Sequence, residues 1–409
     1  MPIATGIAKQ VRYKVESTYG VLPGATAAQL LRRVESNLNI EKDTYQASEL
    51  RTDYQISDYR HGTRKTNGSI KGEFSPRTYA DFIGAALRRD FAVVTPIAGA
   101  SLTIAVGAVV NGVQQYTVIR AAGSYLTDGV KAGDVVRLSV GALNAANINK
   151  NLYVISLTAT VLTVAVLNGV AMVAEGPIVT STVTVFGKKT FVPSTGHTDR
   201  SYAIEHWFAD GPMGEVYTGC KVSTVDINLP PSGMATVDLG FMGSGGITTS
   251  ASAYYTSPTA STTTGIMAAV NGALYIGGAA VAICTGLSIK LDGGYSGDPV
   301  VGSNVMPQIF AGRVNVTGQF TAYFDSATFR DAFLNESELA LSVVLTADNT
   351  ATSEFIAITL PRIKLGSASR SDGEKGIIVT ASFQALYNGA GGAGTATEQT
   401  TISMQDSAA

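Results

Sequence analysis

Two distant stretches of the chain repeat one pattern of apolar and polar positions. Each alternates apolar or small residues with polar ones, which predicts a strand with one buried face. Each is then followed by apolar residues at helical spacing. The residues expected to form this sheet and helix core are Ile70, Gly72, Phe74 and Phe82 in the first unit, and Val316, Gly318, Phe320 and Phe333 in the second. A strand-helix unit used twice indicates one sheet built in two halves, and it favours a scaffold over a catalytic site.

The helix of the first unit is expected over residues 79–87. Ser75 is a suitable N-cap and Pro76 a suitable first helical residue, because the hydroxyl accepts a bond from a free N–H and proline needs no donor there. In the second unit, residues 329–333 show the same spacing over a shorter stretch.

The pattern of apolar runs and turn residues changes near residue 95 and again near residue 190. Between them, short apolar runs alternate with Gly and Asn turns, which predicts an inserted small β-barrel or sandwich at 95–190. The principal domain is expected to consist of a first half, 1–94, and a second half, 191–390. An uncharged Gly/Ser/Thr tract at 243–265 predicts a flexible loop or arm. Residues 391–409 lack an apolar period and are expected to form a mobile C-terminal tail.

A polar, charge-rich segment at 41–66 predicts a long exposed hairpin, with a strand at Tyr54 and Ile56. Its basic residues alternate with acidic ones. Paired charges therefore explain the segment as well as a surface for single-stranded nucleic acid does. We favour a contact with a neighbouring subunit. The candidate residues for this ring-stacking interface are Asp53, Tyr54, Asp58, Tyr59, Arg60, Arg64 and Lys65.

Composition and charge narrow the class of protein. The 409 residues suffice for two or three domains, and abundant Gly, Val, Thr and Ala favour strands and turns. The formal net charge of −2 creates no general attraction to nucleic acid. No signal peptide opens the chain, so we expect cytoplasmic synthesis and free thiols at Cys220 and Cys284.

Two long uncharged runs raise the question of membrane spans. Residues 151–174 alternate β-branched residues with Thr and contain Asn168-Gly169, a hairpin-turn pattern, so two strands are expected there. Residues 239–289 are filled with Ser, Thr and Gly. Neither run has the continuous apolar character of a spanning helix, and no membrane contact is predicted.

Sequence motifs for catalysis, cofactor binding or metal binding are absent or match only in part. The three histidines, His61, His197 and His206, lack HExxH spacing, and His206 lies in an apolar strand where packing or an interface is the favoured role. The GxGxxG-like run at 389–394 lacks the helix and the later acidic residue that a dinucleotide site needs. Residues 292–298 lack the ligand pattern of a calcium loop and predict a tight turn. We predict no catalytic residues, no cofactor and no metal.

The order of these elements resembles the tail tube, or major tail, proteins of long-tailed bacteriophages. The resemblance rests on Tyr19-Gly20, the polar hairpin leading to Lys71-Gly72-Glu73-Phe74, the helix at 79–87, and the later stretches 287–289, 302–307 and 316–320. It covers residues 1–94 and 191–390. Segment 95–190 looks like the extra surface domain that some members carry.

The resemblance implies a mainly β fold, with a sandwich or barrel of two antiparallel sheets, one flanking helix and an inserted small β domain. It implies hexameric rings that stack into a tube through the hairpin and the terminal arms. The channel would hold a tape measure protein and then pass double-stranded DNA without specific binding, and tail terminator or tip proteins would meet the tube ends. Such a protein is a structural part of the virion, made and assembled in the host cytoplasm, and not an enzyme.

Two other functions stay open at this point. An exported adhesin or surface polymer subunit would need an export route, and the missing signal peptide counts against it. A β-fold carbohydrate-active enzyme would need two carboxylates in a cleft, and no pair stands out in the sequence. A mass measurement separates these classes, because a tube protein forms rings or polymers.

Overall fold

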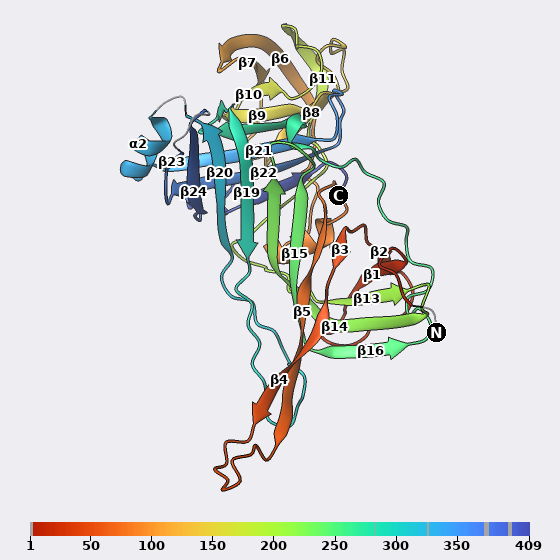
Figure 1. Ribbon diagram of the computed structural model, residues 1–409. Coiled ribbons are helices and arrows are strands. Elements are labelled where there is room, and N and C mark those ends of the chain that lie inside the picture. Colours follow the sequence, from red (N-terminus) through yellow and green to blue (C-terminus); the bar gives the residue numbers. More distant parts are fainter. Residues whose placement is uncertain (1–2, 282, 325–326, 372–375, 392–394) are drawn as a thin grey trace.

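The computed structural model describes residues 3–281, 283–324, 327–371, 376–391 and 395–409. Over these residues the chain is built mainly of antiparallel strands, with two α-helices (Figure 1). The predicted mainly β fold with two antiparallel sheets is confirmed. The second helix, at 328–334, lies where the helical spacing of the second unit predicts one, whereas the family resemblance implied one flanking helix only.

The first sheet, here called the lateral sheet, lies at the N-terminal side of the molecule (Figure 1). Its strands in spatial order are β2 (Gln29–Leu30), β1 (Lys9–Val15), β13 (Tyr202–Phe208), the first part of β14 (Met213–Leu229) and β16 (Gly246–Ser250).

The second sheet, here called the long sheet, runs through the centre of the molecule. Its main strands in spatial order are β5 (Tyr59–Glu73), β15 (Thr236–Gly243), the second part of β14, β19 (Cys284–Asp292), β20 (Asn315–Tyr323), β24 (Ile378–Ala385), β22 (Phe355–Leu365), β21 (Leu339–Thr346) and β17 (Gly272–Ile276). Shorter strands extend it: β3 (Glu35–Ser36) and β4 (Asn39–Gln46) beside β5, β18 (Ala279–Ala280) beside β17, β23 (Ser369–Arg370) beside β24, and β25 (Ser403–Asp406) between β22 and β12 (Lys188–Phe191).

Strand β14 belongs to both sheets because its backbone turns at Gly219. This residue has a φ of 68°, a left-handed conformation that glycine adopts without steric cost. Its N–H donates a hydrogen bond of 2.8 Å to the buried carboxylate of Glu16. The two sheets are thereby joined through one continuous strand.

The two repeated units share one hydrophobic core. Phe74 follows β5, Phe320 lies in β20, and both belong to the same cluster of buried side chains. The structure buries Ile70, Phe74, Phe82, Val316 and Phe320, together with Gly72, and half-buries Gly318.

Phe333 does not belong to this core, contrary to the prediction. It lies in α2 (Thr328–Leu334), and its side chain is 39% exposed. This helix has only seven residues and buries Ala332 alone, because it lies on the outer side of the long sheet beside β23 and β24 (Figure 1).

Helix α1 (Ala80–Leu87) begins later than its predicted cap. The Ser75 hydroxyl forms a 2.7 Å hydrogen bond with the Thr78 hydroxyl in the preceding turn, and Tyr79 takes the N-cap position without a side-chain cap. The predicted Ser75 cap is therefore wrong. The helix is held by its buried face, which includes Phe82 and Leu87.

Segment 97–185 closes into a six-stranded barrel. The strands in spatial order are β10 (Val161–Val166), β7 (Val113–Arg120), β6 (Ile97–Val110), β11 (Glu175–Val185), β8 (Val135–Ser139) and β9 (Leu152–Leu157). The two strands expected in 151–174 are present as β9 and β10. Their turn lies at residues 158–160, where Thr158 N–H donates to Val161 O, and not at Asn168-Gly169.

Two segments expected to be mobile are parts of the sheets. In 391–409, strand β25 is buried within the long sheet, with Met404 3% exposed, and Ile402 just before it is 1% exposed. In 243–265, strand β16 pairs with β14, and Tyr255 is fully buried. These sequences lack a long apolar period because their strands are short and their polar side chains have internal partners. The GxGxxG-like run extends into 392–394, which lie outside the described residues.

Candidate assembly surfaces

The hairpin β4–β5 projects beyond both sheets at the lower end of the molecule in Figure 1. Its strands pair from Asn39 and Asn67 out to Gln46 and Tyr59, and residues 47–58 form the tip. Almost every residue of the outer half is exposed. The long exposed hairpin expected at 41–66 is therefore present, while the strand expected at Tyr54 and Ile56 is not, because Tyr54 has a φ of 58° within the tip.

Two charge pairs lie at the outer end of the hairpin. Arg51 donates three hydrogen bonds to the Asp53 carboxylate, the shortest at 2.8 Å, and this contact lowers the pKa of Asp53. Arg60 Nε lies 2.7 Å from Asp58. These pairs are exposed and screened by salt, so each contributes little to stability. Their consequence is that the tip presents no unpaired charge from these four residues.

Three apolar side chains of the tip lie in water. Leu50, Tyr54 and Ile56 are 103%, 99% and 65% exposed. An exposed group of apolar side chains is a typical mark of a contact surface. Sequence reasoning named Tyr54 as an interface residue but missed Leu50 and Ile56. The available signal was the presence of two aliphatic residues in an otherwise polar loop.

Arg64 and Lys65 lie at the base of the hairpin and not at its tip. Arg64 N–H donates a 2.9 Å hydrogen bond to Asn304 O, and its Nε is buried without a hydrogen-bond partner among the described residues. Lys65 faces Glu41 across the hairpin at 3.9 Å. The seven predicted interface residues therefore divide: the five from Asp53 to Arg60 are exposed at the outer end, and these two are half-buried.

A second extended segment, residues 293–314 between β19 and β20, runs beside the base of the hairpin (Figure 1). Met306 N–H donates to Ser244 O, which fixes the segment to the body. Its outer part exposes Val301 completely, at 106% of the reference area. The end of the molecule that carries the hairpin thus offers two neighbouring projections.

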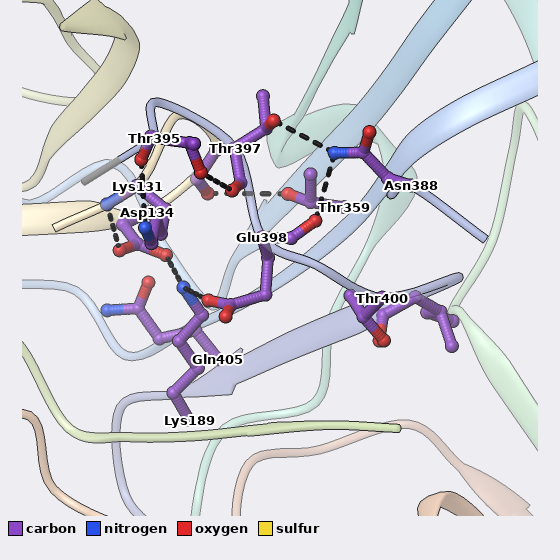
Figure 2. A network of polar contacts seen from close by, with 12 residues as sticks. Lys131, Asp134, Lys189, Thr359, Asn388, Thr395, Thr397, Glu398, Thr400 and Gln405 are labelled. Carbon is purple, nitrogen blue, oxygen red and sulfur yellow. Dashed lines mark hydrogen bonds and ion pairs between the residues drawn. The ribbon is translucent and has the colours of Figure 1, made fainter. Parts of the chain in front are cut away.

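A buried ion cluster joins the barrel to the long sheet (Figure 2). Lys189 Nζ lies 2.5 Å from the Asp134 carboxylate and 3.1 Å from that of Glu398, and all three side chains are at least largely buried. Burial raises the pKa of Asp134, and attraction to Lys189 opposes this. Burial disfavours the charge on Lys189, but Asp134 and Glu398 more than compensate and raise its pKa. The Lys189 ammonium group is thus ion-paired with two buried carboxylates.

Around this cluster the barrel and the long sheet also share hydrogen bonds and apolar contacts. The Gln405 side chain accepts a bond from Val135 N–H and donates to Val135 O and Phe186 O. The rings of Tyr153 and Tyr275 stack with centroids 4.1 Å apart. The barrel is therefore packed onto the body and not tethered by a loose linker.

The remaining groups of chemical interest have structural surroundings. His206 is buried beside the Ser36 hydroxyl at 2.8 Å, and burial, with Lys9 and Arg33 nearby, lowers its pKa to about 3. Cys220 and Cys284 are both free thiols. Gly294 N–H donates to Asp292 in a tight turn at the end of β19. The described residues contain no group of three or more His, Cys, Asp or Glu side chains placed to bind a metal.

None of the helices in the described part of the chain has the length and apolar character needed to cross a membrane. No curated protein matches the sequence. A family model does match, over residues 6–385, and its description is phage tail tube protein. This match spans nearly the whole chain, including the hairpin, the barrel and every strand of the two sheets except β25. The chain therefore belongs to the phage tail tube protein family, a structural family of the bacteriophage tail.

Proposed function

We propose that six copies of this chain form a ring, and that rings stack into the tube through which the phage genome enters the host. The observation that carries this proposal is the hairpin β4–β5, which projects from the body with an apolar tip. An isolated two-stranded hairpin is marginally stable in water. The outer part of this hairpin projects away from its own subunit. A contact with another subunit explains why the hairpin is so long.

Within a ring, subunits would join through the lateral sheet. Strand β16 pairs only with β14 among the described residues, so one of its edges carries unpaired backbone groups. Such an edge is a template for a strand from a neighbouring molecule. Pairing there would extend the lateral sheet from one subunit into the next.

The channel would hold the tape measure protein before infection and pass double-stranded DNA afterwards. A conduit has to avoid binding its cargo, and a net charge of −2 supplies no general attraction for phosphates. Tail terminator or tip proteins would meet the ends of the tube. The barrel at 95–190 would face outwards as a surface domain, on a virion assembled in the host cytoplasm.

Negative-stain microscopy of the purified protein tests this proposal. The wild-type chain is expected to form rings or tubes, whereas an adhesin or an enzyme would remain a small species. A variant in which Asn-Gly replaces residues 48–57 should keep the fold, since that loop is exposed, but should stop at single rings.

The double variant Arg51→Ala/Asp53→Ala is the matched control, because it removes a pair that is bonded within the tip. It should still form tubes. Normal tubes from the shortened hairpin would contradict stacking through the tip. Tubes that bind free DNA tightly at physiological salt would contradict the role as a conduit.

A further inference from the structure

An apolar groove lies at the end of the long sheet. It has a volume of about 430 Å³ and is lined by residues that include Leu229, Pro230, Leu274, Val281, Cys284 and Leu287. None of the lining residues that the structure describes carries a charge. Val270, at 82% exposure, stands at its rim. A groove of this size and character can take several apolar side chains.

The groove and the hairpin tip lie at opposite ends of the same sheet. Strand β5 starts beside the tip at Tyr59 and ends at Glu73, and its fifteen residues span roughly 46 Å at about 3.3 Å per residue. Glu73 is level with Thr236 on β15, Asn228 on β14 and Ser288 on β19. Two residues that line the groove are next to this level in the sequence: Leu229 follows Asn228, and Leu287 precedes Ser288.

We propose that the apolar tip of the hairpin in one copy of this chain occupies this groove in a copy of the next ring. The inference rests on the tail tube function proposed above and names the receptor for its stacking contact. Two different surfaces at opposite ends of identical subunits make a heterologous contact, which propagates head to tail without closing. A tube grows by this kind of contact.

The chemistry of the two surfaces is complementary. The tip offers Leu50, Tyr54 and Ile56, and two of its charged residues, Arg51 and Asp53, are bonded to each other. Asp58 is paired with Arg60, and Glu49 accepts a 3.0 Å hydrogen bond from the Ser57 hydroxyl. A single charge buried in an uncharged groove would have no partner there, which is unfavourable. Arg51 and Asp53 avoid this cost because each is the partner of the other. The match also accounts for exposed aliphatic residues that have no role within the subunit.

The size of the contact sets its strength. Three side chains bury less than the roughly 800 Å² per partner of a typical stable complex. One tip in one groove is therefore a weak bond, and a subunit is held only when its whole ring docks at once. Growth is then expected to be cooperative, with a sharp critical concentration.

Cys284 supplies a direct test, because it lines the groove and is only partly buried, whereas Cys220 is fully buried. Tubes of the Tyr54→Cys variant are oxidised with copper phenanthroline at alkaline pH, since burial raises the pKa of the Cys284 thiol. Non-reducing gels should show a ladder of dimers, trimers and longer species. The ladder should be absent from the wild type and from Tyr54→Cys/Cys284→Ser.

Val301→Cys is the positional control, because Val301 is fully exposed at the same end of the molecule on another segment. Equal ladders from Val301→Cys and Tyr54→Cys would show non-specific collisions and overturn the proposal. Tubes of Tyr54→Cys that give no ladder would also overturn it while leaving the tail tube function intact. If Tyr54→Cys fails to assemble, Leu50→Cys places the thiol on the same tip.

A second test changes the groove and uses no thiol chemistry. Val270→Glu puts a charge at the rim, and Val179→Glu puts one at a similarly exposed valine of the barrel. The first should raise the critical concentration for tube growth at least tenfold, and the second should leave it unchanged. Equal critical concentrations would overturn the proposal. A wild-type protein that forms neither rings nor tubes would instead contradict the proposed function itself.

Discussion

Gly72 and Gly318 lie at the same level of the long sheet. Val237, Ile227 and Ile289 stand between them, one on each intervening strand. Both glycines face the hydrophobic core, since the residues two positions before and after each of them are buried. The two copies of the repeated unit therefore enter one sheet in register. Each glycine leaves room for an aromatic side chain, Tyr79 at the first position and Phe383 at the second.

The first glycine gives a stability prediction. The Tyr79 hydroxyl occupies the space that a Cβ atom would take at Gly72, and it donates a 3.0 Å hydrogen bond to Arg32 O. Gly72→Ala should lower the free energy of unfolding by about 2–4 kcal/mol, through overpacking and the loss of this bond. Urea denaturation measures the change. Gly24→Ala, at an exposed site with open space around it, is the control and should change stability by less than about 0.5 kcal/mol.

The strands of the two sheets were largely predictable because alternation is a local property. Ile70 and Phe74, for example, lie on one face by sequence spacing alone. Strand β25 was not predictable in this way. Gln405 is buried there only because its partners Val135 and Phe186 come from 270 and 219 residues away. Burial of a polar side chain depends on such distant partners, which a local pattern does not contain.

In the candidate assembly surface, too, features set by the local sequence were predictable and features set by distant contacts were not. The polarity of 41–66 predicted the exposed hairpin correctly. The contribution of Leu50 and Ile56 was missed, because single apolar residues in a loop have no period. Arg64 was expected to be exposed, but segment 293–314 folds back against it. Contacts between distant loops decide which charged residues of a polar segment reach the solvent.

The ion cluster between barrel and body gives a second stability prediction. Lys189→Met removes the ammonium group that is ion-paired with both buried carboxylates, Asp134 and Glu398, and Lys131 is the cation that stays near them. Breaking a buried pair in this way should cost about 3–5 kcal/mol. Arg60→Ala breaks an exposed pair and should cost less than about 1 kcal/mol. Denaturation of both variants checks the contrast, and equal costs would show that the buried cluster does not hold the barrel in place.

A pH dependence follows from His206. Its ordinary pKa is 6.5, and burial lowers it to about 3, so the folded state stays neutral at pH values where the unfolded chain binds a proton. Stability from this residue is complete above about pH 6.5 and falls as the pH drops towards 3. The loss between pH 7 and pH 4 should be about 3 kcal/mol.

Urea unfolding at pH 7, 5 and 4 measures this loss by comparing the wild type with His206→Gln. The variant should lack this part of the acid sensitivity, so the difference between the two curves should shrink as the pH falls. His197→Gln, at an exposed histidine, is the control and should follow the wild type. Parallel curves for the wild type and His206→Gln would show that His206 is not the acid-sensitive group.

The last prediction is that the barrel can be removed without loss of tube formation. Ala92 and Lys189 exchange two backbone hydrogen bonds, of 2.9 and 2.8 Å, so the chain enters and leaves the barrel at adjacent points. Insertions are tolerated where the two ends meet in this way. A short Gly/Ser linker in place of residues 95–186 should therefore close the gap and keep β12 paired with β25.

Removing the barrel uncovers part of the long sheet, and the variant has to allow for this. Val344 and Phe355 pack against barrel residues, so both are changed to Thr, which suits an exposed strand. Tyr275 is kept because it lines the groove that we assign to the hairpin tip, and Lys189 retains Glu398. Size-exclusion chromatography and microscopy should show folded subunits that form tubes with a thinner wall. The deletion also removes Val113, the one groove-lining residue that the barrel supplies, while the hairpin, the β16 edge and the other lining residues of the groove stay. Folded subunits that stay single would mean that the barrel takes part in assembly, through its own surface or through Val113.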